Sequence, residues 1–190
     1  GGYQIERSLR FRSGVPGYLT RTYGVAPTTK TKCTISAWVK LCAFGTSRVL
    51  FDCYNGSVGN QTIFRFNTSD QLEFDIGGAS ALPIVTTAVF RDPSAWLHIV
   101  CVLDTTLGSS RVKFWVNGAS QAVTGTGPGS SATHQLTSAN ANNKVGSTYN
   151  GNGNYFNGYM AEFHFIDGQA LTPSSFGETN PTTGAWDPIE

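Results

Sequence analysis

One short pattern repeats along most of the 190 residues of this chain. Runs of five to nine residues alternate apolar with polar side chains, and turn-forming residues separate one run from the next. A period of two places the apolar side chains on one face of a β-strand and the polar ones on the other. The runs are SLRFR, YLTRTY, CTISAWVKL, RVLFDCY, TIFRFN, QLEFDI, WLHIVCVLD, RVKFWVNG, KVGSTY and YMAEFHFI. Many short strands with turns between them predict an all-β fold, an antiparallel β-sandwich.

The composition favours turns and strands over helices. The chain holds 22 Gly, 12 Phe, 7 Tyr and 4 Trp, but only 13% charged residues and one Met, so the residues that build long helices are scarce. Asn117-Gly118 predicts a tight type I′ hairpin, because both central positions of that turn take positive φ. A single helical turn is predicted at ALTPSSF, where Thr172 acts as the cap and Pro173 takes the first helical position.

Length and charge narrow the classes of function. A chain of 190 residues suits one domain with one sizeable core. Its net charge of +1 gives no electrostatic attraction to nucleic acid or to an anionic membrane, and neither is expected as a partner. No apolar run approaches the ~20 residues that span a bilayer, so we expect no membrane insertion.

The cysteines have no spacing typical of a metal site. They are Cys33, Cys42, Cys53 and Cys101. None forms a CxxC pair, and the three histidines are scattered, which argues against zinc. Three of the cysteines lie in apolar runs, where a free thiol behaves as a small hydrophobe. We therefore expect buried free thiols, while one disulfide between strands that are neighbours in the fold stays open.

Two stretches within the chain lack the strand pattern, around residues 77–83 and at residues 124–143. The second, TGTGPGSSATHQLTSANANN, is a polar segment of a length that usually indicates function or mobility. The tail GETNPTTGAWDPIE, residues 177–190, has too little apolar content for a core element. It predicts an extended strap or the start of a linker.

The opening, middle and closing segments carry a family resemblance. They are SLRFRSGVPGYLTRT with CTISAWVK, then DPSAWLHIVCVLDTT with RVKFWVNG, and finally GYMAEFHFIDGQALTPSSFGETNPTTGAW. Together they resemble the edge strand, the central pair and the closing strand of laminin-G-like domains, within the concanavalin A-like lectin/glucanase fold. FRDPSAWLHIV and FIDGQALTPSSFGE are in addition similar to domains of tailed-phage structural and tail-fibre proteins.

The resemblance covers about residues 3–187 and implies a jelly roll of two packed, curved antiparallel sheets. We place a laminin-G-like jelly-roll domain at residues 3–176 and a C-terminal strap or linker at residues 177–190. The resemblance also implies that Trp38 and Trp96 lie in the core. Enzymes, sugar-binding modules and adhesion modules share this fold, so the function has to be argued from the site.

Neither acidic cluster on the predicted strands makes a complete active site. Retaining glucanases need two carboxylates about 5 to 5.5 Å apart, which on a strand means alternating acids. Glu73 and Asp75 alternate, but no third acid follows; a solvated strand face is the simpler interpretation. Glu162 shares its face with His164 and with no second acid, as in a structural hydrogen-bonded pair. We therefore expect no catalytic residues and no enzyme activity.

A loop rich in Tyr and Asn is the best candidate for binding. Sugar sites combine an aromatic platform with polar groups for the hydroxyls. Residues 147–158, STYNGNGNYFNG, offer both, and we expect this loop to lie near Tyr18. Residues 52–62 form a second candidate loop, and Trp115 is either an exposed stacking platform or a core residue. The predicted carbohydrate-binding residues are Tyr149, Asn150, Asn152, Asn154, Tyr155, Tyr18, Tyr54 and Trp115.

Many laminin-G-like domains bind Ca²⁺ through an Asp and loop oxygens, which suit a hard cation. The opening loop RSGVPGY and the late loop NGNGNYFNG contain no Asp. We expect a weak Ca²⁺ site at most and no other cofactor or metal.

These features together predict a non-catalytic module of a phage virion, in a tail fibre or on a capsid, that binds a cell-surface carbohydrate for host attachment. Its partners would be that glycan and other virion protein subunits, and the fibre resemblance implies a homo-oligomer such as a trimer. Two alternatives stay open: a structural decoration or oligomerisation domain without sugar binding, and a glycoside hydrolase.

Overall fold

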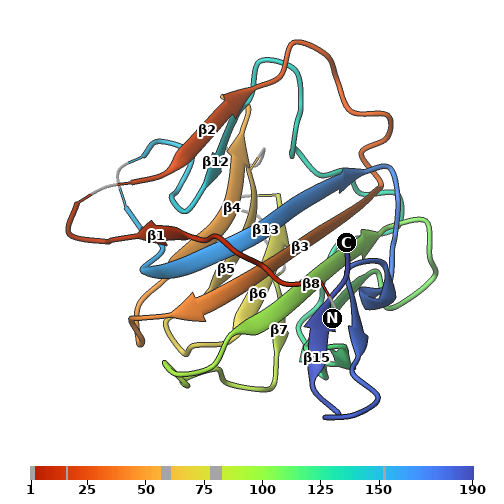
Figure 1. Cartoon of the computed structure of the whole chain (residues 1–190). Coiled ribbons are helices and arrows are strands. Elements are labelled where there is room, and N and C mark those ends of the chain that lie inside the picture. The colour runs from red at the N-terminus through yellow and green to blue at the C-terminus, as the bar shows by residue number, and fades with distance from the viewer. Residues whose placement is uncertain (1–2, 16, 57–60, 78–82, 152) are drawn as a thin grey trace.

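The chain forms two stacked antiparallel sheets (Figure 1) in a computed structural model that describes residues 3–15, 17–56, 61–77, 83–151 and 153–190. The six-stranded sheet has the spatial order β1 (Leu9–Phe11), β13 (Gly158–Asp167), β3 (Lys32–Leu41), β8 (Leu97–Asp104), β9 (Val112–Val116) and β10 (Ala119–Ser120). The seven-stranded sheet has the order β11 (Val123–Thr124), β7 (Ile84–Thr86), β6 (Leu72–Ile76), β5 (Gln61–Phe66), β4 (Arg48–Tyr54), β12 (Asn142–Val145) and β2 (Leu19–Thr22). The predicted all-β jelly-roll sandwich is confirmed.

Strand alternation puts the core between the two sheets. On β3 the odd-numbered residues are apolar and point into the core. Their paired residues on the neighbouring strand β8 are also apolar and point the same way. Phe64 of β5 and Phe114 of β9 stack across the core with ring centroids 5.9 Å apart. The inward residues of β3 are Cys33, Ile35, Ala37, Val39 and Leu41. Their period of two explains how the sequence pattern alone predicted these strands.

Small features of the chain also agree with the sequence. Asn117 and Gly118 take φ of 49° and 76° between β9 and β10, which confirms the predicted hairpin. The one-turn helix η2 spans Pro173–Ser175 with Pro at its start, as predicted; Thr172 stands at the N-cap position, but its side chain makes no capping hydrogen bond. All four cysteines are free, and only Cys42 is exposed, so the predicted free thiols are confirmed.

The long polar segment before β12 is built into the fold. His134, Leu136 and Ala141 are buried, the last two within the core. The backbone N–H of His134 bonds the carbonyl of Lys30 next to β3, and that of Gln135 donates to Thr62 Oγ1 on β5 at 2.8 Å. This segment therefore bridges the two sheets, a structural role that its polar composition did not predict.

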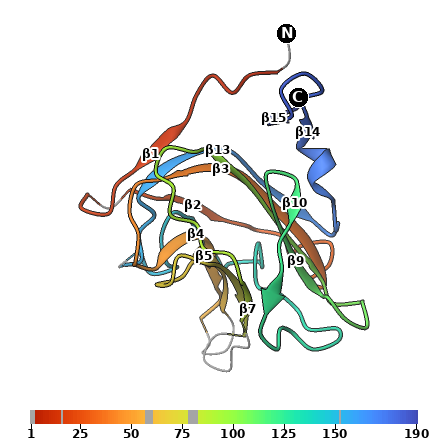
Figure 2. The same ribbon diagram turned by 90° about the horizontal axis from the view of Figure 1, so that it is seen from below.

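The tail covers the outer face of the six-stranded sheet. Strands β14 (Gly177–Thr179) and β15 (Trp186–Pro188) form a small antiparallel hairpin on the side facing away from β4 and β5 (Figure 2). The Trp186 indole fits against two glycines, because a Cβ at Gly118 or at Gly177 would lie 2.5 Å or 2.6 Å from it. The tail is thus a packed hairpin, and the domain boundary at residue 176 stays a prediction.

Of the two tryptophans expected in the core, one is buried and one is not. Trp38 is 8% exposed, but it occupies an even-numbered position of β3, so it is buried beneath the tail on the outer face and stacks on His98, with ring centroids 5.0 Å apart. Trp96 precedes β8 and is 37% exposed, so the prediction for it is wrong. Trp38 lies on the outer face because of the alternation of β3, and Trp96 because it directly precedes Leu97, the first, inward-facing residue of β8.

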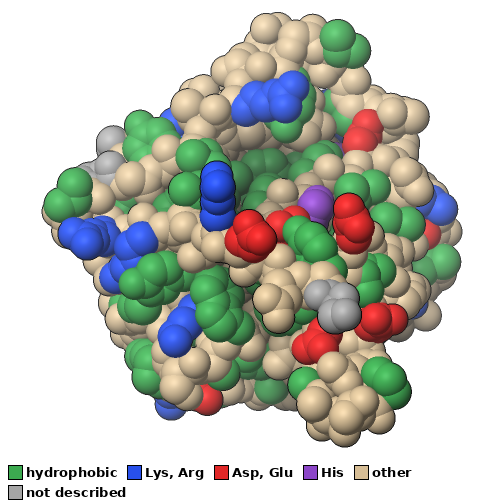
Figure 3. All heavy atoms as spheres, in the orientation of Figure 1, with side chains coloured by type: hydrophobic (Ala, Val, Ile, Leu, Met, Phe, Trp, Pro, Cys, Tyr) green, Lys and Arg blue, Asp and Glu red, His purple; other side chains and the backbone are tan. Residues whose placement is uncertain are grey.

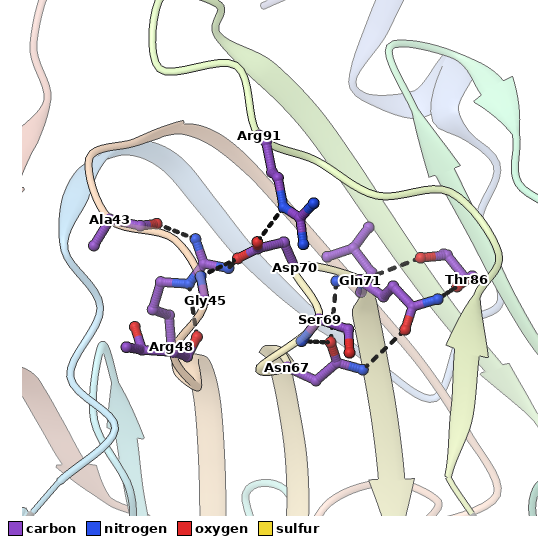
Figure 4. Close-up of polar contacts among 11 residues, drawn as sticks. Ala43, Gly45, Arg48, Asn67, Ser69, Asp70, Gln71, Thr86 and Arg91 are labelled. Atoms are coloured by element: carbon purple, nitrogen blue, oxygen red, sulfur yellow. Dashed lines mark hydrogen bonds and ion pairs between the residues drawn. The ribbon is translucent and has the colours of Figure 1, made fainter.

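A buried ion pair fastens one end of the sandwich (Figure 4). Arg48 and Asp70 are both about 1% exposed, and Asp70 also accepts bonds from Arg91 at 2.6 Å and from the Gly45 N–H at 2.7 Å. Burial alone would raise the pKa of Asp70, but the hydrogen bonds from Arg91 and Gly45 and the Arg48 charge outweigh it and lower that pKa. Asp70 therefore joins the β3–β4 loop, the β5–β6 turn and the segment before β8.

Candidate functional site

The outer face of the seven-stranded sheet carries a row of polar side chains. Lys144 of β12 pairs with Thr20 of β2 on one side and with Asp52 of β4 on the other. In the next row, Tyr54 of β4 lies opposite Gln61 of β5. Directly opposed residues share a face of a sheet, and their neighbours in sequence point into the core.

The β12–β13 loop folds onto this outer face. The Tyr149 ring stacks on the Tyr54 ring with centroids 4.1 Å apart and planes 26° apart. The Tyr149 backbone N–H donates to Asp52 Oδ2 at 2.8 Å. The two candidate loops of the sequence therefore meet in one aromatic pair, each ring half-buried.

Asp52 holds the loop and the sheet together. Its side chain is buried, and the Gln61 amide donates to Oδ1 at 3.0 Å and to Oδ2 at 2.9 Å. Burial raises the pKa of Asp52 to about 6, although the bonds from Tyr149 and Gln61 favour the charged form. The carboxyl group is buried and already accepts hydrogen bonds from a sheet residue and from the loop, which suits positioning better than chemistry.

Tyr18 completes the surface from the other side. It is 38% exposed at the start of β2, and the Lys144 ammonium lies 4.1 Å from its ring centroid. A Cβ at Gly151 would lie 2.9 Å from the Tyr18 hydroxyl, so the loop and Tyr18 are in contact as the sequence predicted. We call this surface the Tyr54 face, defined by Tyr18, Asp52, Tyr54, Lys144 and Tyr149.

The other predicted loop residues differ in their positions. Tyr155 donates its hydroxyl to the Gly151 carbonyl and so braces the loop from within. Asn150 is exposed next to Tyr149. Asn154 is exposed with φ of 50°, and its carbonyl accepts the Val49 N–H at 2.8 Å. Asn152 lies outside the described residues.

Trp115 is not part of the Tyr54 face. It lies on β9, in register with Val100 and Ser120, and points to the outer side of the six-stranded sheet. Phe114, its neighbour, is fully buried in the core. The whole core therefore separates Trp115 from the Tyr pair.

Two residues of the Tyr54 face, Asp52 and Lys144, and the adjoining Gln61 were missed from the sequence. Asp52 is an acid inside the apolar strand RVLFDCY, which is the signal that could have found it. What the sequence lacks is the strand order β5-β4-β12-β2, which brings them together.

The acidic residues considered as catalytic candidates, Glu73 with Asp75 and Glu162 with His164, have different partners. Glu73 Oε1 accepts a 2.9 Å bond from Arg65 Nε, so this carboxylate is tied up in an ion pair. Burial, and then the Glu73 charge, raise the pKa of neighbouring Asp75 to about 6. On the other sheet, Glu162 lies 3.4 Å from His164 and accepts a 3.0 Å bond from the Tyr3 hydroxyl.

Within the residues that the structure describes, no group of three or more His, Cys, Asp or Glu side chains is arranged to hold a metal ion. Over the same residues, no helix has the length and apolar character needed to cross a membrane.

Comparisons with known proteins agree with the two-sheet architecture. The family model described as concanavalin A-like lectin/glucanases superfamily matches residues 16–175. Among curated proteins, no sequence matches the chain.

Several solved structures share the fold at low sequence identity. The carbohydrate-binding module CBM40 of the Ruminococcus gnavus IT-sialidase, bound to α2,3-sialyllactose, is 14% identical with a TM-score of 0.59, covering 90% of this chain and 97% of that one. Domain 4 of the arabinanase AbnA from Geobacillus stearothermophilus, in complex with arabinotriose, is 20% identical with a TM-score of 0.57, covering 91% and 79%. The heptameric SAP-like pentraxin of Limulus polyphemus is 15% identical with a TM-score of 0.56, covering 92% and 76%.

Proposed function

The chain belongs to the concanavalin A-like lectin/glucanases superfamily, and we propose that it is a non-catalytic carbohydrate-binding module. The observation that carries the proposal is the Tyr54 face. Three tyrosines from three separate segments meet there beside a lysine and an amide. Similar folds bound to sialyllactose and to arabinotriose make sugar the first ligand class to consider.

The stacked pair suits the apolar face of a sugar ring. Tyr54 and Tyr149 each use one ring face on the other, so a pyranose would stack on the remaining face of one of them. The surrounding strands supply hydroxyl and amide groups at Thr22, Asn142 and Gln61, in register with Tyr54. Lys144 is only 8% exposed and lies opposite Asp52 under the Tyr18 ring, so it supports this aromatic wall and does not offer a free charge to the ligand.

The biological setting is a finer proposal. The similarity of FRDPSAWLHIV and FIDGQALTPSSFGE to phage tail-fibre domains supports a virion protein that attaches to a glycan on the host surface. In that setting the partners are other virion subunits, and the module acts on the assembled virion. A structural decoration or oligomerisation domain is the competing role.

Hydrolysis is the less favoured role, because one carboxylate of the alternating pair is already bound. Glu73 is in an ion pair with Arg65, and Gly77 stands where a third alternating acid would lie. A hydrolase would release reducing ends from its substrate and would lose that activity on Glu73→Gln.

A glycan array with the wild-type protein, two variants of the Tyr54 face and one control variant tests the proposal, with calcium present and absent. Tyr149→Ala and Tyr18→Ala are expected to weaken binding of the same glycans about tenfold each, since each removes one aromatic wall. Trp115→Ala, on the opposite sheet, is the matched control and should bind as the wild type does. An array that stays silent with folded protein, or binding that only Trp115→Ala removes, would contradict the proposal.

A further inference from the structure

A second hollow lies on the opposite side of the molecule, on the outer face of the six-stranded sheet. The N-terminal residues 3–8 run across this face toward the tail hairpin (Figure 2). Between them, the sheet and the hairpin lies a cleft of about 570 Å³. We call it the tail cleft; its walls include Glu6, Arg7, Trp38, Trp96, Asn180 and Asp187.

Two tryptophans supply flat apolar walls. Trp96 is 37% exposed, and its ring lies 6.4 Å from that of Tyr159, which restricts how it can turn. Trp38, which is 8% exposed, is held against His98 and lines both the tail cleft and an adjoining cavity of about 250 Å³. An indole held in place before a ligand arrives loses little conformational entropy when a sugar ring stacks on it.

The hairpin contributes an oriented amide and a carboxylate. Asn180 Nδ2 donates to Asp187 Oδ2 at 2.8 Å. The side-chain oxygen Oδ1 of Asn180 accepts hydrogen bonds from the backbone N–H groups of Thr182 and Thr183, which fixes the amide in this orientation. A carboxylate beside an oriented amide can bind the hydroxyls of a sugar ring.

The charge around the tail cleft is negative although the chain as a whole carries +1. Glu6 and Asp187 line the cleft with one cation, Arg7, and Glu162 and Glu190 line the adjoining cavity. Acidic side chains gather around a histidine in a hollow of this face (Figure 3). Indole rings and carboxylates together favour a positively charged ligand.

The backbone at Glu162 supports a binding role for this face. Glu162 takes φ of 46° at a β-bulge in β13, between Ala161 and His164. A non-glycine residue at positive φ costs free energy, and such costs are typical of binding sites. The bulge turns the Glu162 carboxylate toward Tyr3, at the wall of the tail cleft.

We propose that the tail cleft is a second saccharide site, which selects sugars that carry a free ammonium group, such as hexosamine units. The Trp96 indole takes the sugar face, Asn180 takes hydroxyls, and the Glu6 and Asp187 carboxylates take the ammonium. The site is independent of the Tyr54 face, which lies across the core.

The test compares two tetrasaccharides of the same length, fully deacetylated and fully N-acetylated β-1,4-glucosamine, by calorimetry at mildly acidic pH. The deacetylated sugar carries an ammonium group at each position where the acetylated sugar carries a neutral acetamide. The deacetylated sugar is expected to bind about tenfold more tightly than the acetylated one. Trp96→Ala should weaken the binding of both sugars. Glu6→Gln and Asp187→Asn should each reduce the preference for the deacetylated, positively charged sugar.

Tyr149→Ala separates this site from the Tyr54 face and should leave binding of the deacetylated sugar unchanged. Circular dichroism checks that each variant is folded. Absence of binding, equal affinity for the two sugars, or binding that Trp96→Ala leaves intact and Tyr149→Ala removes would overturn the proposal. The last outcome would still agree with the Tyr54 face as a sugar site.

Discussion

The indole N–H of Trp186 donates a hydrogen bond to Nδ1 of His98 at 2.9 Å, although 88 residues separate the two. Because an indole can only donate, Nδ1 is the unprotonated nitrogen, and Nε2–H donates to Ser36 Oγ at 2.8 Å. Burial first, and the nearby His164 second, lower the pKa of His98 to about 4. A neutral imidazole therefore fastens the tail to the sheet.

Trp186→Phe is expected to raise the pKa of His98 and to destabilise the fold by about 1 kcal/mol. The phenyl ring still fills the slot, but Nδ1 loses its donor and becomes available to a proton. His98 has a folded-state pKa below its ordinary value, so its contribution is complete above about pH 6.5 and is lost as the pH falls through about 4. NMR titration of the imidazole nitrogens measures the shift, with Trp115→Phe as the control. An unchanged pKa near 4 would refute the role of the Trp186 bond.

Asp75→Asn is expected to stabilise the protein at neutral pH. The pKa of Asp75 is raised to about 6 by burial and by Glu73, so its contribution to stability is present below about pH 3.8 and is lost as the pH rises through about 6. Asn cannot ionise, so we expect the variant to have a free energy of unfolding higher than the wild type by up to ~3 kcal/mol near pH 8 and by almost nothing near pH 3.5. Urea unfolding at the two pH values measures the difference. A gain of equal size at both would mean that ionisation is not the cause.

Asp70→Asn is expected to cost about 3–5 kcal/mol, because it leaves Arg48 buried without its counter-ion. Asp70 takes φ of 63°, a conformation that Asn also tolerates, so the change tests charge rather than backbone. Arg91→Ala is the control: its side chain is 60% exposed, and a loss of about 1 kcal/mol is expected. Chemical denaturation compares the variants, and equal losses would contradict the ranking.

One thiol in the folded protein should react rapidly with a thiol reagent, and four after unfolding. Cys42 is exposed, whereas Cys33, Cys53 and Cys101 are buried. Burial raises the pKa of Cys53 to about 12, and burial also raises the pKa of Cys33 and of Cys101, so little reactive thiolate forms. Absorbance with Ellman's reagent, with Cys42→Ser as control, counts the thiols. Rapid reaction in the Cys42→Ser protein would show that a buried strand opens readily.

Local pattern predicted the strands well, and long-range contacts decided the rest. The alternation of CTISAWVKL and WLHIVCVLD identified β3 and β8, because one face of each packs on the core. It could not show that the tail covers the opposite face, where Trp38 is buried and Trp96 is 37% exposed; the core position expected for both came from the family resemblance. For the same reason, the structural role of the polar segment before β12 was not predicted, since its buried positions depend on strands far away in sequence.

By itself the sequence determined an all-β sandwich, its hairpin at Asn117-Gly118, and the aromatic and amide-rich loop that supplies Tyr149. Only the tertiary structure decided that Tyr149 stacks on Tyr54 near Tyr18, and that Trp115 lies on the far side of the core. Period-two alternation is written into consecutive residues, so it can be read locally. Strand order is set by which faces pack best across the whole molecule, and it is strand order that assembles a binding face.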